Sequence, residues 1–261
     1  MNTQLIVTAS RPWCAEMVAE MIRNSINDVV GLFHVTVIVD CEEYSDTANY
    51  FYEAILEACN PWNEEVALQV IRTHYEALSD GATIIERRQR IIQLWNIAKM
   101  NVRPEAEYII SFEDDTFFPA YFFTEWLHML KADQHLQYVE GAECHRRGAK
   151  AIGAWEITDK IVSSLPYNKK NLILQPIQGG GFYGFATRAL NVIQADFRED
   201  GPAFGPDVCF VYDTLQRTKG KAVVDWRCEC EHHLEDGSIL FPWDSNETIV
   251  YMNINGEWQQ V

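Results

Sequence analysis

Residues 108–115 read YIISFEDD and decide the fold, because an apolar run that predicts a buried strand ends at three consecutive acids, Glu113, Asp114 and Asp115. In open α/β sheets, ligands bind outside the carboxyl ends of the strands. Adjacent carboxylates at such an end repel one another, and burying them without a positively charged partner costs free energy. Hard divalent cations take carboxylate oxygens and often complete their shell with water and substrate phosphates. We therefore predict a divalent-cation site here, in preference to an acidic turn whose Asp caps the next helix.

Strands and helices alternate on both sides of this stretch, which predicts a mostly parallel α/β sheet flanked by helices. The apolar runs 5–9 and 35–39 predict two further strands. Helices are expected over residues 14–24, 47–59, 64–78 and 83–100, and from Pro119 to about residue 131.

The pattern changes after residue 135, where glycines, turns and short strands dominate. Strands are expected at 137–144, 149–154, 172–174, 221–230 and 248–253, and a helix at 206–218. We expect one domain over residues 1–261, whose first half, to about residue 134, binds a nucleotide and whose second half binds another substrate.

The charge of the chain excludes one broad class of function. Its 261 residues carry 21 Lys and Arg against 38 Asp and Glu, a net charge of −17, whereas general nucleic-acid binders neutralise phosphates with basic residues. No run reaches the roughly 18–20 apolar residues of a membrane helix, and the first residues do not form a signal peptide. The seven cysteines are odd in number and scattered, as in reduced proteins. We expect a soluble, cytoplasmic protein that does not insert into membranes.

Polar side chains also end the first two strands. Thr8, Ser10 and Arg11 follow the first, and Asp40 follows the second, so all are expected at the same sheet edge. Hydroxyl groups can contact a base or ribose, and Arg11 suits a phosphate. The expected helix 83–100 begins with Arg87, Arg88 and Arg90. These arginines either pair with surface acids, or one of them points toward a diphosphate. For that second role we choose Arg87.

Two further segments leave alternatives open. The glycine-rich run 178–184 is neither a P-loop nor a dinucleotide fingerprint, so it forms either a tight bend or a loop facing a ligand. Asp207 opens the expected helix 206–218, where it either complements the helix N-terminus or acts as a general base.

Residues 228–233 read CECEHH, but the spacing matches no usual zinc site. Strand periodicity predicts that Trp226, Cys228, Cys230 and His232 share one core face. Either histidine could supply one ligand to a metal held elsewhere, and His233, nearer the loop, is favoured.

Together these segments resemble glycosyltransferases of the GT-A fold, in particular the Glu-Asp-Asp type of inverting N-acetylglucosaminyltransferases. The matches are short and lie within residues 3–233, YIISFEDDTFFPAYFFTEWL (108–127) being the most specific. The resemblance implies a Rossmann-like, mixed and mostly parallel sheet, a UDP-sugar donor, Mn²⁺ or Mg²⁺, and transfer to an acceptor hydroxyl with inversion. It implies a C-terminal lid and the following roles: uracil binding by Asp40, metal binding by Asp115 and His233, ribose or metal-shell contact by Glu113, donor-sugar contact by Asp114, acceptor binding by Gly180, Gly181 and Phe182, and the catalytic base in Asp207.

The acceptor stays open between a glycan, a small molecule and a hydroxylated base in DNA. For DNA, basic residues at 145–147 and at Lys150, Lys169 and Lys170 would guide the strand. Two other classes remain: a nucleotidyltransferase that uses the same acids on a nucleoside triphosphate, and a non-catalytic module that binds sugar nucleotides.

Overall fold

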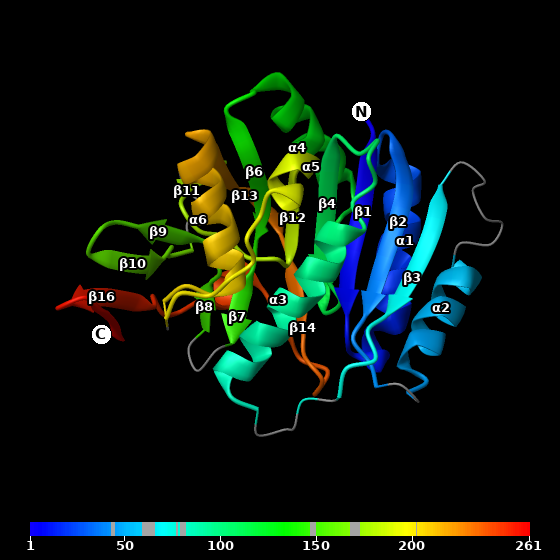
Figure 1. Cartoon of the computed structure of the whole chain (residues 1–261), viewed down its shortest axis with the longest axis horizontal. Coiled ribbons are helices and arrows are strands. Elements are labelled where there is room, and N and C mark those ends of the chain that lie inside the picture. Colours follow the sequence, from blue (N-terminus) through cyan, green and yellow to red (C-terminus); the bar gives the residue numbers. More distant parts are fainter. Residues whose placement is uncertain are drawn as a thin grey trace.

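An eight-stranded mixed sheet forms the centre of the molecule (Figure 1). The computed structural model describes residues 1–42, 45–58, 66–76, 78, 82–146, 150–167, 173–201 and 203–261. The strand order is β11-β13-β6-β12-β4-β1-β2-β3, in which β12 and β11 run against the other six. The bounds are β1 (Thr3–Ala9), β2 (Leu32–Val39), β3 (Ala67–Arg72), β4 (Tyr108–Glu113), β6 (Leu136–Ala142), β11 (Leu174–Ile177), β12 (Gly184–Arg188) and β13 (Lys221–Glu229).

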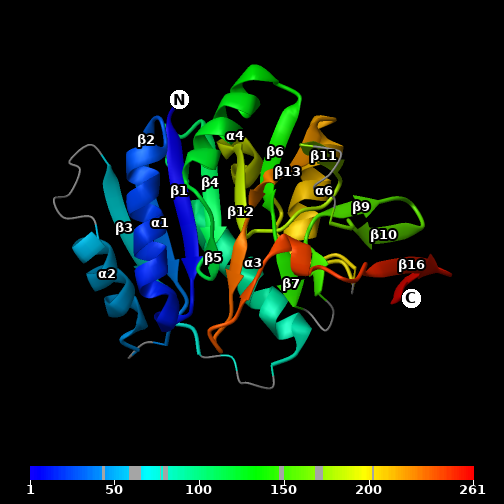
Figure 2. The ribbon, with the colours of Figure 1, turned by 180° about the vertical axis from the view of Figure 1, so that it is seen from behind.

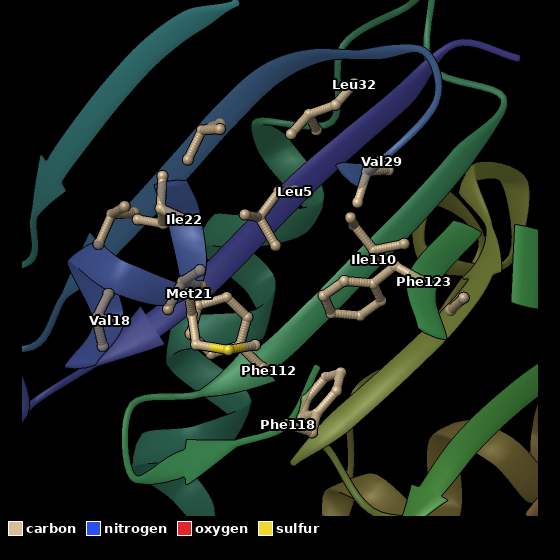
Figure 3. Packing of buried hydrophobic residues seen from close by; sticks show 14 of the residues in the cluster. Leu5, Val18, Met21, Ile22, Val29, Leu32, Ile110, Phe112, Phe118 and Phe123 are labelled. Atoms are coloured by element: carbon tan, nitrogen blue, oxygen red, sulfur yellow. The ribbon is translucent and has the colours of Figure 1, made fainter. Parts of the chain in front are cut away.

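Helices cover both faces of this sheet, as Figures 1 and 2 show from opposite sides. One core cluster packs α1, α2 and α4 on one face, and a second packs α3, α5 and α6 on the other. Because strand side chains alternate, Leu5 and Val7 enter the first cluster and Ile6 the second. Figure 3 shows Leu5 pointing toward Ile22 and Phe112 in the first cluster. The helices are α1 (Ala15–Asp28), α2 (Thr47–Ala58), α3 (Ile84–Met100), α4 (Tyr121–Ala132), α5 (Ala189–Ile193) and α6 (Pro206–Thr218).

Local sequence signals explain where the helices begin. The side chain of Thr83 accepts a hydrogen bond from the amide of Glu86, whose carboxylate accepts one from the amide of Thr83, and this capping box starts α3. Pro206 occupies the first turn of α6, where its missing amide hydrogen costs nothing. Among the described residues, no helix has the length and apolar character needed to cross a bilayer.

Smaller sheets extend the second half of the chain. β9 (Trp155–Ile157), β10 (Ile161–Ser164), β16 (Val250–Ile254) and β17 (Glu257–Gln260) form one sheet, and β7 (Cys144–Arg146) pairs with β8 (Lys150–Ile152). A third sheet joins β5 (Thr116–Phe117), β14 (Glu231–His233) and β15 (Ile239–Leu240). This third sheet brings the histidine pair of β14 against the end of β4. Short 3-10 helices, η1 (Pro12–Cys14) and η2 (Pro242–Asp244), complete the described elements.

The structure confirms the mostly parallel α/β sheet and corrects three predictions of detail. The helix predicted at 64–78 is wrong, because residues 67–72 form β3 at the sheet edge, parallel to β2. Leu68 and Val70 of β3, two residues apart, both pack against the α1–α2 core. The apolar residues therefore repeat every two residues, as in a strand, and not every 3.6 residues, as in a helix. Residues 64, 65 and 77 of that range, like residues 59, 149 and 172 of other predicted elements, lie outside the described residues.

The second correction is β12, a strand that the glycine-rich run concealed. It lies in the middle of the sheet, between β4 and β6. The third concerns β13, whose register shifts between Asp225 and Glu229. Such an irregularity turns the side chains that follow it, so that Trp226 packs in the α3–α6 core while Cys228 and Cys230 pack in the opposite one.

Candidate active site

A cleft of about 790 Å³ opens at the carboxyl ends of β1 and β4. Its walls come from the β1–η1 loop, the first turns of α3 and α6, and β14 with the loop after it. Most predicted site residues line it, namely Ser10, Arg11, Arg87, Glu113, Asp115, Asp207 and His233. A smaller hollow of about 440 Å³ shares Ser10 and Leu78 with the cleft and contains Asp40. Thr8, Asp114, Gly180, Gly181 and Phe182 line neither.

Parallel pairing of β1 with β4 explains why the first loop and the acids meet. Thr8 is the register partner of Glu113, so the residues that follow both strands emerge side by side. The backbone amides of Ser10 and Arg11 donate to Asp114 Oδ2 at 2.6 and 2.9 Å, and the Arg11 guanidinium contacts the other oxygen. Asp114 is buried, so its direct contacts stabilise this loop.

The two oxygens of Asp115 have different surroundings. Its Oδ2 lies 2.9 Å from Arg11 Nη1 and 3.2 Å from His232 Nε2. Its Oδ1 is buried and has no hydrogen-bond partner among the described residues. Burial alone would raise the pKa of Asp115, but the hydrogen bond from His232 and the charge of Arg11 outweigh burial and lower it. Asp115 is therefore an ionised carboxylate in which Arg11 and His232 hold one oxygen, while the other is buried without a hydrogen-bond donor among the described residues.

The two histidines of β14 have different partners. His232 lies between Asp115 and the fully buried Glu143, whose Oε1 is 3.3 Å from His232 Nδ1. Burial disfavours a charge on the ring, yet Glu143 and Asp115 prevail and raise the pKa of His232 to about 9. His233 Nε2 instead lies 3.0 Å from Glu231 Oε2. The histidine that contacts the predicted metal ligand is thus His232, whereas the sequence favoured His233.

The side chains around Asp115 can be compared with those of known divalent-cation sites. Within the described ranges, no group of three or more His, Cys, Asp or Glu side chains forms a ready-made metal cage. Magnesium-like cations at nucleotide sites usually take only one or two protein carboxylates and complete their shell with water and phosphates. Asp115 lines the cleft, and its buried Oδ1 is an acceptor without a hydrogen-bond donor among the described residues, which fits that kind of site.

The arginines of α3 serve different places. Arg87 and Arg88 both line the cleft, and Arg88 also donates to the carbonyl of Gly201. Arg90 Nη1 contacts both oxygens of Asp40, at 2.6 and 2.8 Å, and its guanidinium carbon lies 4.9 Å from the Tyr75 ring centroid. Asp40 is therefore half of an ion pair in the smaller hollow, which the sequence did not indicate.

Asp207 lies in the first turn of α6 and also lines the cleft. An acid in a first turn complements the positive end of the helix dipole. The two interpretations left open by the sequence are compatible, because a residue in this turn also faces the cleft.

Packing accounts for the glycine-rich run. The Gly181 amide donates to Oε2 of the fully buried Glu140 at 2.8 Å, and its carbonyl accepts a hydrogen bond from Tyr138. A Cβ added at Gly181 would overlap the Tyr183 ring. Phe182 is buried in an aromatic cluster, with its ring centroid 4.4 Å from that of Trp95. The tight-bend interpretation therefore explains these residues through direct contacts.

Gly181→Ala should lower the free energy of unfolding by about 1–3 kcal/mol, because the added methyl group overpacks a filled core. It should leave the affinity for UDP unchanged, since Gly181 lies outside the cleft. Urea denaturation and calorimetric UDP titration measure the two effects. Loss of UDP affinity at unchanged stability would contradict this assignment.

Comparison with known proteins finds similarity in fold and assigns no function. No protein-family model and no curated protein matches the chain. A mycobacterial protein of known structure aligns with a TM-score of 0.51 and 13% identity over 90% of this chain and 68% of its own. S. aureus TarS 1–349 aligns with a TM-score of 0.48 and 14% identity over 92% of this chain and 59% of its own. The 4-diphosphocytidyl-2C-methyl-D-erythritol synthase of Anaerococcus prevotii gives 0.47 and 11% over 92% and 90%. At these identities the similarity concerns the fold alone.

Proposed function

We propose that this protein transfers a sugar from a nucleoside-diphosphate sugar, with UDP as the expected carrier, to an acceptor hydroxyl with inversion. The observation that carries the proposal is Asp115, which follows β4, lines the same cleft as Asp207 and has a buried Oδ1 without a hydrogen-bond donor among the described residues. One oxygen suited to a cation and one acid suited to a proton are the two groups that such a transfer needs.

The donor would lie across both hollows. Its base would enter the smaller one beside Asp40, Arg90 and Ser10. Glu113, in the lining of the larger cleft, is the proposed contact to the ribose. Thr8 lines neither hollow, so it is assigned no donor contact. Arg11 and Arg87 would face the diphosphate, since guanidinium groups match phosphate oxygens. Asp115, with His233 as the proposed second ligand, would hold Mn²⁺ or Mg²⁺. The bound cation would offset the negative charge that builds on the leaving diphosphate.

Transfer needs a proton acceptor on the acceptor side. In the proposed reaction, the acceptor oxygen forms a bond to the sugar C1 while the bond from C1 to the β-phosphate oxygen breaks. Asp207 accepts the hydroxyl proton, which requires it to lie within hydrogen-bond reach of that hydroxyl. Asp114 is assigned to positioning of the first loop, because its oxygens already accept from Ser10 and Arg11.

The first loop also weighs against the nucleotidyltransferase alternative. Those enzymes usually carry a glycine- and lysine-rich loop after the first strand, whereas here Ser10, Arg11 and Pro12 follow β1. The products distinguish the two reactions: glycosyl transfer releases a nucleoside diphosphate, and nucleotidyl transfer releases pyrophosphate from a nucleoside triphosphate.

The acceptor remains a glycan, a small molecule or a modified base in DNA. Of the basic residues proposed to guide DNA, Arg147, Lys169 and Lys170 lie outside the described residues, and Lys150 belongs to β8. Binding of oligonucleotides that weakens steeply with salt would favour the DNA acceptor.

A further inference from the structure

A line of polar side chains runs from the cleft into the core behind Asp115. Asp115 Oδ2 meets His232 Nε2 at 3.2 Å, and His232 Nδ1 meets Glu143 Oε1 at 3.3 Å. The other Glu143 oxygen accepts a hydrogen bond from Thr116 Oγ1 at 3.0 Å. These four residues, the Asp115 relay, come from three places: the β4–β5 segment, β14, and the junction between β6 and β7.

Burying the relay's polar side chains costs free energy, which apolar side chains of the same size would not. Glu143 is fully buried, and a buried carboxyl group loses its hydration without the packing gain of an apolar side chain. Its neighbours on the chain, Ala142 and Cys144, are buried small side chains. The single buried glutamate at this junction is also directed at the ring of His232.

The geometry of the relay leaves the His232 ring little freedom. One ring nitrogen faces a carboxylate oxygen of Asp115, and the other lies near Glu143 Oε1 and 3.2 Å from the Cys144 carbonyl. Rotation of the ring would break contacts at both ends. Arg11 Nη1 holds the same Asp115 oxygen from the cleft side, at 2.9 Å. Oδ2 is therefore fixed from two directions, and the position of Oδ1 follows from it.

We propose that Glu143 and His232 are positioning residues that fix the Asp115 carboxylate so that Oδ1 is presented to a divalent cation. The inference rests on the proposed function, because it needs a cation in the cleft. Partners that orient a metal-binding side chain typically change metal affinity about 10- to 100-fold when they are removed. This assigns the two residues a role in cation binding without direct ligation.

The test is a calorimetric titration of Mn²⁺ into the full chain with saturating UDP, corrected for Mn²⁺ binding to free UDP. We expect Glu143→Gln and His232→Gln each to weaken Mn²⁺ binding about 10- to 100-fold. Because the two act through one carboxylate, the double variant should lose little more than either single variant. In an Asp115→Asn background, neither change should have any further effect.

Glu140→Gln is the matched control, since Glu140 is also a fully buried glutamate of the β6 region but bonds to Gly181. It should leave Mn²⁺ affinity unchanged. If His232→Gln fails to fold, the near-isosteric Glu143→Gln still decides the matter. Wild-type affinity in Glu143→Gln, or an equal loss in Glu140→Gln, overturns the proposal. A loss in His233→Gln with none in His232→Gln overturns it too. A wild-type protein that binds UDP but no Mn²⁺ instead overturns the metal role in the proposed function.

Discussion

Asp115→Asn is expected to reduce metal-dependent turnover of the donor about 10²- to 10³-fold while the fold stays intact. The amide keeps the shape of the side chain but removes the negative charge that would hold the cation. Stabilisation of a leaving diphosphate by a cation is worth several kcal/mol, and each 1.36 kcal/mol corresponds to about tenfold in rate. Arg11 keeps its second carboxylate partner, Asp114, so the first loop should remain in place.

Initial rates of nucleoside diphosphate release across a Mn²⁺ titration measure this loss. Asp213→Asn is the control, because it removes a carboxylate paired with Arg198 outside the cleft. The control should retain wild-type rates and the same Mn²⁺ dependence. Normal rates in Asp115→Asn, with an unchanged metal requirement, would remove Asp115 from the cation site.

Asp207→Asn is expected to stop transfer while donor binding persists. A general base contributes about 10²- to 10⁴-fold to a rate, and an amide cannot accept the acceptor proton. The first turn of α6 should survive the change, because Pro206 still starts the helix and Gly205 still precedes it.

The effect of Asp207→Asn is measured as the transfer rate at saturating donor, beside calorimetric affinity for UDP and Mn²⁺. Asp200→Asn, at an exposed acid before α6, controls for a change of charge near the helix. If Asp207→Asn weakens donor binding as much as transfer, Asp207 belongs to the donor site. If transfer is normal, it has no role as a base.

The fold could be predicted where a strand is buried on both faces. β1, β2 and β4 are buried along almost their whole length and each contains a short apolar run, which is typical of the interior of a parallel sheet. β3 lies at the edge and is only partly buried, so its pattern gave a false helical period. β12 contains a glycine and follows three more, and its central position depends on pairing with strands distant along the chain.

The sequence predicted those site contacts that depend only on two parallel strands lying next to each other in the sheet. Strands β1 and β4 end at the same edge, which places Arg11 beside Asp114 and Asp115. The choice of His232 over His233 depends on the pairing of β14 with β5, which no local pattern encodes. Glu143 and the Arg90–Asp40 pair were missed for the same reason, since each joins segments far apart in the sequence.

The measurement that tests the central claim most directly is a panel of nucleoside-diphosphate sugars, incubated with the protein and Mn²⁺ and scored for release of the nucleoside diphosphate. The panel is run alone, with glycan and small-molecule acceptors, and with DNA that carries hydroxylated bases. Parallel reactions with nucleoside triphosphates and sugar phosphates are scored for pyrophosphate. The proposed function predicts that one uridine-linked donor releases UDP in a Mn²⁺-dependent reaction that Asp115→Asn slows about 10²- to 10³-fold. A flat response across all donors, or pyrophosphate as the product, would contradict it.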